Sequence, residues 1–79
     1  MDKYKYRYYT HPLNDVDNKQ LERETETPEQ LLKDLNIKEN TTGMVHVINK
    51  ETDSVMCRYS IVAFATLYHH PVHKVNYTS

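Results

Sequence analysis

Cysteine is nearly absent from this sequence, since Cys57 is the only one among 79 residues. A single cysteine excludes an intrachain disulfide, which fits a reducing compartment. The length predicts a single domain, residues 1–79. A chain of this size buries only about 60% of its unfolded surface, so its stability margin is thin and a homodimer would add to it.

Long apolar runs are also absent. The longest unbroken stretch, Ile61 to Ala65, is far shorter than the roughly 20 residues of a membrane-spanning helix. The start of the chain, MDKYKYRYY, lacks the apolar segment of a signal peptide. We therefore expect a cytoplasmic protein that does not engage a membrane.

Catalytic signatures are missing as well. His46 and Cys57 could be neighbours across a hairpin, but nucleophilic catalysis also needs an orienting group and an oxyanion site, and no motif supplies them. We expect a buried structural cysteine. The sequence therefore predicts no catalytic residue, no cofactor and no enzyme.

A cluster of histidines near the C-terminal end, His69, His70 and His73, suggests a metal site at first sight. The rings of His69 and His73 would share one face only on a helix, and Pro71 opposes that helix. On a strand they would lie about 13 Å apart. We expect a polar turn there and no metal ligand, and the sequence leaves open whether these histidines have a role.

Charge is present in both signs and is unevenly distributed. The net charge is −1, with +2 on residues 1–12, −4 on residues 13–43 and +1 on residues 44–79. The chain therefore has a basic arm and an acidic middle.

The basic arm alternates between tyrosines and cations from Lys3 to Thr10, which predicts a strand ending at His11-Pro12. One face would carry Tyr4, Tyr6 and Tyr8, and the other Lys3, Lys5 and Arg7. These cations could bind nucleic acid, although they and the tyrosines lie on opposite faces.

The acidic middle contains a row of glutamates, Glu22, Glu24 and Glu26, followed by Glu29. In an extended chain alternate carboxylates lie about 6.6 Å apart, and such a row can imitate a phosphate backbone and fill a basic groove. The alternative is a solvated acidic segment. Residues 21–26 are interpreted as extended or irregular, with strand or loop left open.

A helix is predicted from Thr27 to Asn36. Thr27 can cap its first turn, and Pro28 suits the first helical position. The apolar stripe that would pack on the rest of the protein consists of Leu31, Leu32 and Leu35.

A hairpin is predicted from Met44 onward, with a two-residue turn Glu51-Thr52 or a four-residue loop in the same register. This register places His46 opposite Cys57 and Ile48 opposite Val55. Residues 61–68 continue the second strand after a bend or form a short buried helix, and both alternatives stay open.

These elements predict an α+β fold, with a small antiparallel sheet of three to five strands and one main helix packed on one face. The expected core is listed as Tyr6, Tyr8, Leu31, Leu32, Leu35, Met44, Ile48, Val55, Tyr59, Ile61, Phe64 and Leu67.

The composition, rich in Lys, Asn and Tyr, and the compact organisation resemble small phage-encoded anti-defence proteins such as anti-CRISPRs. The middle of the chain also resembles the uracil-DNA glycosylase inhibitor family. The matching residues are Lys19-Gln20-Leu21, Pro28-Glu29, Val45-His46 and Val55-Met56. That resemblance implies a DNA mimic with a carboxylate before the helix, here Glu22 or Glu24, and acidic residues at the helix start. The position two after the proline, Gln30, departs from this pattern.

The resulting hypothesis is a non-enzymatic protein that inhibits or sequesters a bacterial host protein, such as a nuclease, a glycosylase or another defence or DNA-processing enzyme. Its contacts would come from Glu22, Glu24, Glu26 and Glu29. The alternative is a small nucleic-acid-binding module that uses Lys3, Lys5 and Arg7.

Overall fold

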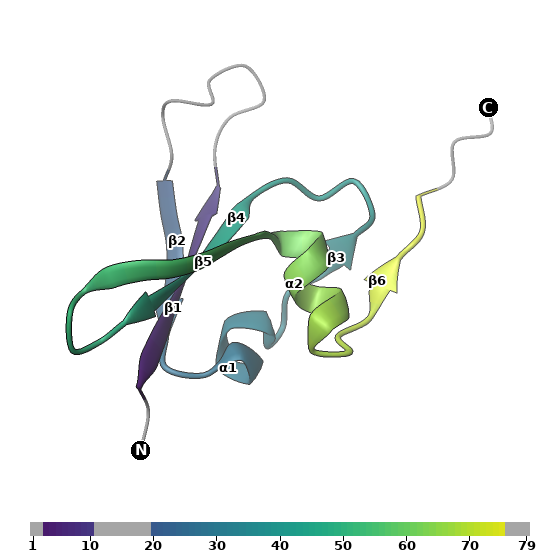
Figure 1. The fold of residues 1–79 in the computed structure, drawn as a ribbon. Helices are drawn as coiled ribbons and strands as arrows, with labels where there is room; N and C mark the ends of the chain where they lie inside the picture. Colours follow the sequence, from purple (N-terminus) through teal and green to yellow (C-terminus); the bar gives the residue numbers. More distant parts are fainter. Residues whose placement is uncertain (1–2, 11–19, 76–79) are drawn as a thin grey trace.

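The computed structural model describes residues 3–10 and 20–75 (Figure 1). Its elements are β1 Tyr4–Thr10, β2 Gln20–Thr25, α1 Pro28–Leu32, β3 Ile37–Lys38, β4 Met44–Asn49, β5 Ser54–Ser60, α2 Ile61–Leu67 and β6 Val72–His73. Four strands form an antiparallel sheet in the order β2-β1-β4-β5, and β3 pairs with β6 in a short parallel sheet. The predicted α+β class is confirmed.

Strand β1 lies inside the sheet, and its alternation is the predicted one. Tyr8 is buried, with 6% of its surface exposed, and Tyr6 packs against the same core. Lys5 and Arg7 point to the opposite face. The predicted end of this strand at His11-Pro12 lies outside the described residues.

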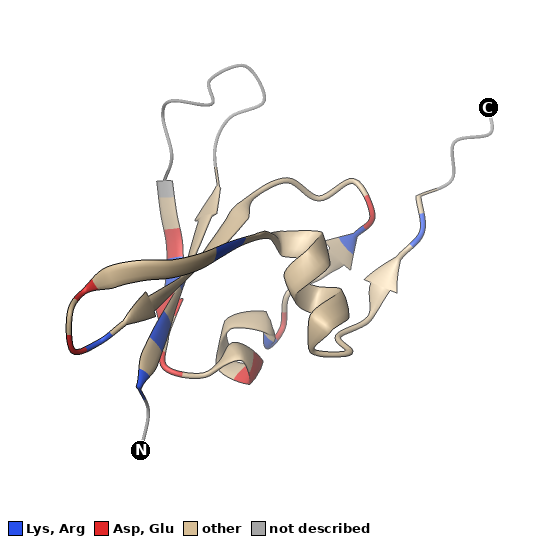
Figure 2. Cartoon of the chain, in the orientation of Figure 1, with Lys and Arg blue, Asp and Glu red and all other residues tan. Residues whose placement is uncertain are grey.

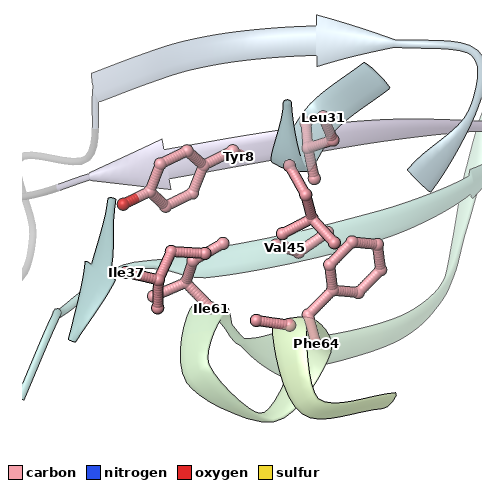
Figure 3. Close-up of a cluster of buried hydrophobic side chains, with 8 residues drawn as sticks. Tyr8, Leu31, Ile37, Val45, Ile61 and Phe64 are labelled. Carbon is pink, nitrogen blue, oxygen red and sulfur yellow. The ribbon is translucent and has the colours of Figure 1, made fainter. Parts of the chain in front are cut away.

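The sheet has one covered and one helix-free face. Helices α1 and α2 contribute Leu31 and Phe64 to the cluster that contains Tyr8 and Val45 (Figure 3). The opposite side of β1, β4 and β5 carries Lys5, Arg7, Tyr9, His46 and Arg58. We call this side the helix-free face, because neither α1 nor α2 packs on it.

The acidic segment, left open from the sequence, is strand β2. It pairs with β1 through Arg7–Glu24 and Tyr8–Arg23, and the register then shifts so that Tyr9 faces Leu21. Glu22 is therefore the extra residue of a β-bulge. Such a bulge twists a strand and re-aims its side chains.

The predicted helix Thr27–Asn36 is wrong at its C-terminal end. The Thr27 hydroxyl accepts from the Gln30 N–H at 3.2 Å and Pro28 opens α1, as expected, but the helix ends at Leu32. Lys33 leaves the helical conformation with ψ 130°, and Asp34 has φ +64°. A left-handed residue cannot continue a right-handed helix.

The β4–β5 hairpin has the four-residue loop, because Asn49 pairs with Ser54. The Asn49 side chain accepts from the Glu51 N–H at 2.8 Å, and Asp53 takes φ +58° to close the turn. The loop allowed from the sequence is therefore the observed one.

The predicted pairing of His46 with Cys57 is wrong. Ile48 does face Val55, but a register shift leaves Met56 as an extra residue, so His46 faces Arg58 and Cys57 faces Val47. One inserted residue reverses the face of everything beyond it, because side chains alternate along a strand.

Residues 61–67 form a helix, so of the two alternatives for residues 61–68, a continued strand or a short buried helix, the helix is the observed one. The Ser60 hydroxyl accepts from the Ala63 N–H at 3.1 Å and caps α2. This turns Ile61, Phe64 and Ala65 into the core.

The predicted core is wrong near the bulge at Met56 and at the end of α2, two features that the sequence analysis did not establish. Val55 and Leu67 are 40% and 52% exposed, and neither belongs to the core. Buried residues missed by the sequence are Ile37, Val45 and Ala65. Val45 was missed because the bulge reverses the predicted faces of the hairpin.

Candidate functional site

The four glutamates predicted to bind a partner do not form one row. Glu24 on β2 makes an ion pair with Arg7 across the sheet. The Glu26 carboxylate lies 3.0 Å from the Lys50 ammonium at the hairpin loop. Both carboxylates are therefore partly neutralised within the chain. Figure 2 marks acidic residues in red and basic residues in blue along the chain.

The other two glutamates have different settings. Glu22 is exposed at the bulge, and its charge adds to the effect of burial in raising the pKa of the Tyr8 hydroxyl. Glu29 lies exposed in the first turn of α1. Within residues 3–10 and 20–75, the Glu29 carboxylate has no ion-pair partner.

Glu26 and Glu29 meet at a pocket of about 290 Å³ where β1 passes the start of α1. Its lining residues are Lys3, Tyr4, Tyr6, Glu26, Thr27, Pro28 and Glu29. We call it the tyrosine–glutamate pocket. The structure thus brings two predicted acidic residues together with tyrosines of the first strand, while Glu22 and Glu24 line other parts of the surface.

A second pocket, of about 410 Å³, adjoins the first through Glu29. It lies between α1 and the chain that follows α2, and it is lined by Glu29, Leu32, Lys33, Tyr68, His69, His70 and Pro71. His70 is fixed there, because its Nε2 atom lies 3.0 Å from the Leu35 backbone oxygen. Glu29 therefore lines both pockets.

Tyr6 and Tyr68, which each line one of these pockets, both pack against the ring of Phe64. Phe64 has its ring centroid 5.9 Å from Tyr6, 4.9 Å from Tyr68 and 6.0 Å from Tyr59. Burial raises the pKa of the Tyr6 hydroxyl, and the neighbouring Tyr68 and Glu29 raise it further. No sequence pattern predicts that Tyr6 and Tyr68 meet, because they lie at opposite ends of the chain.

Two cations of the nucleic-acid-binding hypothesis, Lys5 and Arg7, lie on the helix-free face and both form ion pairs, whereas the third, Lys3, lines the tyrosine–glutamate pocket. The Lys5 ammonium lies 3.1 Å from the Asp53 carboxylate, and Arg7 binds Glu24. The Tyr9 ring packs against His46 on the same face, with centroids 4.7 Å apart and the ring planes tilted by 48°. An aromatic ring therefore accompanies these cations, which the pattern of Tyr4, Tyr6 and Tyr8 had not suggested.

Cys57 is exposed, so the prediction of a buried structural cysteine is wrong. It lies beside Tyr59 on β5, and its negative form raises the pKa of the Tyr59 hydroxyl. Among the described residues, no group of three His, Cys, Asp or Glu side chains is placed to hold a metal ion.

The fold defines the class of this protein as a small α+β domain, and comparisons with known proteins do not narrow it. No protein-family model, no curated protein and no solved structure matches the chain. Neither helix in the described part of the chain is long and apolar enough to cross a membrane.

Proposed function

We propose that this chain is a small non-enzymatic binding protein that inhibits or sequesters a host protein in the bacterial cytoplasm. The observation that carries the proposal is the tyrosine–glutamate pocket, where Tyr4 and Tyr6 lie beside Glu26 and Glu29. Tyrosines that present both a ring and a hydroxyl are frequent anchors in protein interfaces.

The chemistry of the pocket suits a lysine or arginine side chain of the partner. A cation above a tyrosine ring is attracted by the ring's electrons, and a carboxylate at the rim completes its hydrogen bonds. Glu29 suits that role best, since Glu26 already pairs with Lys50. Lys3 also lines the pocket, and it would have to turn toward solvent when the partner's cation enters.

A partner that handles nucleic acid fits this surface. Such enzymes carry basic grooves, and the exposed Glu22 and the Arg7-paired Glu24 would extend the negative surface along β2. The ion pairs at Glu24 and Glu26 reduce their share of the attraction. We therefore assign the main polar contact to Glu29.

The test begins with affinity capture from a bacterial lysate and mass spectrometry, followed by titration calorimetry with the purified candidate. Glu29→Gln should weaken binding about tenfold or more, which is the scale of an interface anchor. Glu51→Gln, in the exposed hairpin loop, is the matched control and should bind like the wild type. Equal affinity of the Glu29→Gln variant and the control would refute the proposed contact.

A second candidate function, nucleic-acid binding, is favoured by Tyr9, whose ring shares the helix-free face with Lys5 and Arg7. Arg58, opposite His46, extends this basic face. Fluorescence anisotropy with single-stranded DNA over a salt series tests it, because phosphate contacts weaken steeply with salt. A lack of binding at low salt would reject this candidate.

A further inference from the structure

We propose that two copies of this chain join edge to edge through β5, paired antiparallel about Cys57, so that their sheets form one continuous eight-stranded sheet. Strand β5 is an outer strand of the four-stranded sheet. In the part of the chain that the structure describes, no strand pairs with its outer side. Its free backbone groups form a template for another strand.

The two edges of the sheet differ in their protection. Both edge strands carry a bulge, β2 at Glu22 and β5 at Met56, but β2 also carries the charges of Glu22, Arg23 and Glu24, which oppose strand addition. Strand β5 carries one charge, Arg58, and its apolar Val55 and Met56 are 40% and 53% exposed. The edge that remains available is therefore β5.

The direction of the backbone groups on β5 follows from one hydrogen bond. The Ile61 N–H donates to the Gly43 oxygen at 3.0 Å, which makes the pair Met44–Ser60 a non-hydrogen-bonded one. Because such pairs alternate, Cys57 directs its backbone N–H and C=O groups at β4, whereas those of Arg58 point outward. Arg58 is thus placed to bond a further strand.

The register follows from the sequence of β5, SVMCRYS. Cys57 is its middle residue, so a two-fold axis beside Cys57 pairs the residues next to it. The regular ladder ends at the bulge, because the extra residue Met56 reverses the alternation of the backbone groups of Ser54 and Val55. Arg58 then faces Met56 of the other copy. Centring the pair on Arg58 would set two like charges opposite each other, which is unfavourable.

The strand that pairs with this edge is β5 of a second copy of the chain. An antiparallel pair of identical strands is its own complement, and a two-fold pair leaves no further β5 edge for growth. The small core of this domain gives a reason for pairing, since chains of this length gain stability from oligomerisation. The Met56 bulge adds local twist, so the two sheets would be strongly twisted at their junction.

Sedimentation across the micromolar range tests the assembly. The wild type and Arg58→Ala should sediment as dimers, since both keep the outward N–H of residue 58. Arg58→Pro should be a monomer, because proline removes that donor but no hydrogen bond to β4. Circular dichroism checks that Arg58→Pro folds; if it does not, Met56→Lys, which sets a cation opposite Arg58 of the other copy, takes its place. A monomeric wild type would overturn the proposal.

Cys57 reports on the register. In a non-hydrogen-bonded pair the two Cα atoms lie about 4.5 Å apart, within disulfide range. The oxidant diamide takes up the two thiol hydrogens, so Cys57 of each copy should join in a disulfide, seen as a dimer band without reductant. Cys57→Ser is the control that cannot cross-link. A wild-type dimer that forms no disulfide would pair elsewhere and would overturn the β5 assignment.

Discussion

The Nη1 atom of Arg23 on β2 lies 2.7 Å from the backbone oxygen of Lys33, the residue that follows α1. The same atom lies 3.0 Å from the Leu31 oxygen. These carbonyl groups have no partner within the helix, because the last turn of any helix leaves its oxygens unsatisfied. A side chain of the edge strand therefore caps the C-terminal end of α1 and ties it to the sheet.

Replacing Arg23 tests this link. Arg23→Met keeps the apolar stem but removes the donors, and it should lower the free energy of unfolding by about 1.5–3 kcal/mol, the range for a hydrogen bond from a charged group. Urea denaturation followed by circular dichroism measures the change. Lys33→Met, which removes an exposed cation at the same helix end, should differ little from the wild type. Equal effects of the two variants would contradict the capping role.

Gly43 occupies a position that no other residue fits. Its φ of +131° is strained for any side chain, and a Cβ would lie 2.5 Å from Cε1 of Tyr8 and 2.9 Å from the Tyr9 oxygen. Gly43→Ala should therefore destabilise by about 2 kcal/mol or more, the scale of combined strain and overpacking. The neighbouring Thr42→Ala is the control for thermal denaturation. A Gly43→Ala protein as stable as this control would show that the close approach to Tyr8 is unimportant.

Ser60 decides whether residues 61–67 form a helix or continue β5. Ser60→Ala removes the acceptor for the Ala63 N–H and should cost about 1 kcal/mol. Ser60→Asp keeps an acceptor at the cap and should restore most of that stability. The two variants are compared by chemical denaturation, and an alanine variant as stable as the aspartate variant would rule out the cap.

The ion pair between Arg7 and Glu24 predicts a pH-dependent contribution to stability. The hydrogen bond from Arg7 lowers the pKa of the Glu24 carboxyl below its ordinary 4.5. The pair therefore stabilises the fold above that ordinary value, and its contribution is lost as pH falls through the lowered pKa. Glu24→Gln should cost about 0.5 kcal/mol at neutral pH, since the pair is exposed, and nothing in strong acid.

Denaturation of the wild type and Glu24→Gln across the acid range measures this difference. Glu51→Gln, an exposed glutamate in the hairpin loop, is the control and should give a constant offset. A difference between the wild type and Glu24→Gln that does not shrink in acid would contradict the assigned role of the ion pair.

Local sequence patterns were sufficient to predict the elements that depend only on neighbouring residues. The alternation of Lys5, Tyr6 and Arg7 predicted β1, and Thr27 with Pro28 predicted the start of α1. The hairpin loop was also among the predictions. Asn49 pairs with Ser54, as the four-residue loop, one of the two predicted alternatives, requires.

Other features depended on contacts between distant residues. The end of α1 is set by Arg23 on another strand, which no pattern within residues 27–36 reveals. The bulge at Met56 is a matter of pairing with β4, and it reversed the face of Cys57. The tyrosine–glutamate pocket likewise joins β1 to the start of α1.

The sequence by itself determined the α+β class, the first strand and the beginning of the first helix, because backbone propensity, alternation and capping act within a few residues. The tertiary structure alone decided which glutamates are neutralised, which tyrosines share a pocket with Glu29, and which strand edge stays unprotected. Those outcomes depend on register and on pairs such as Arg7–Glu24, where one residue of shift changes the face that meets solvent.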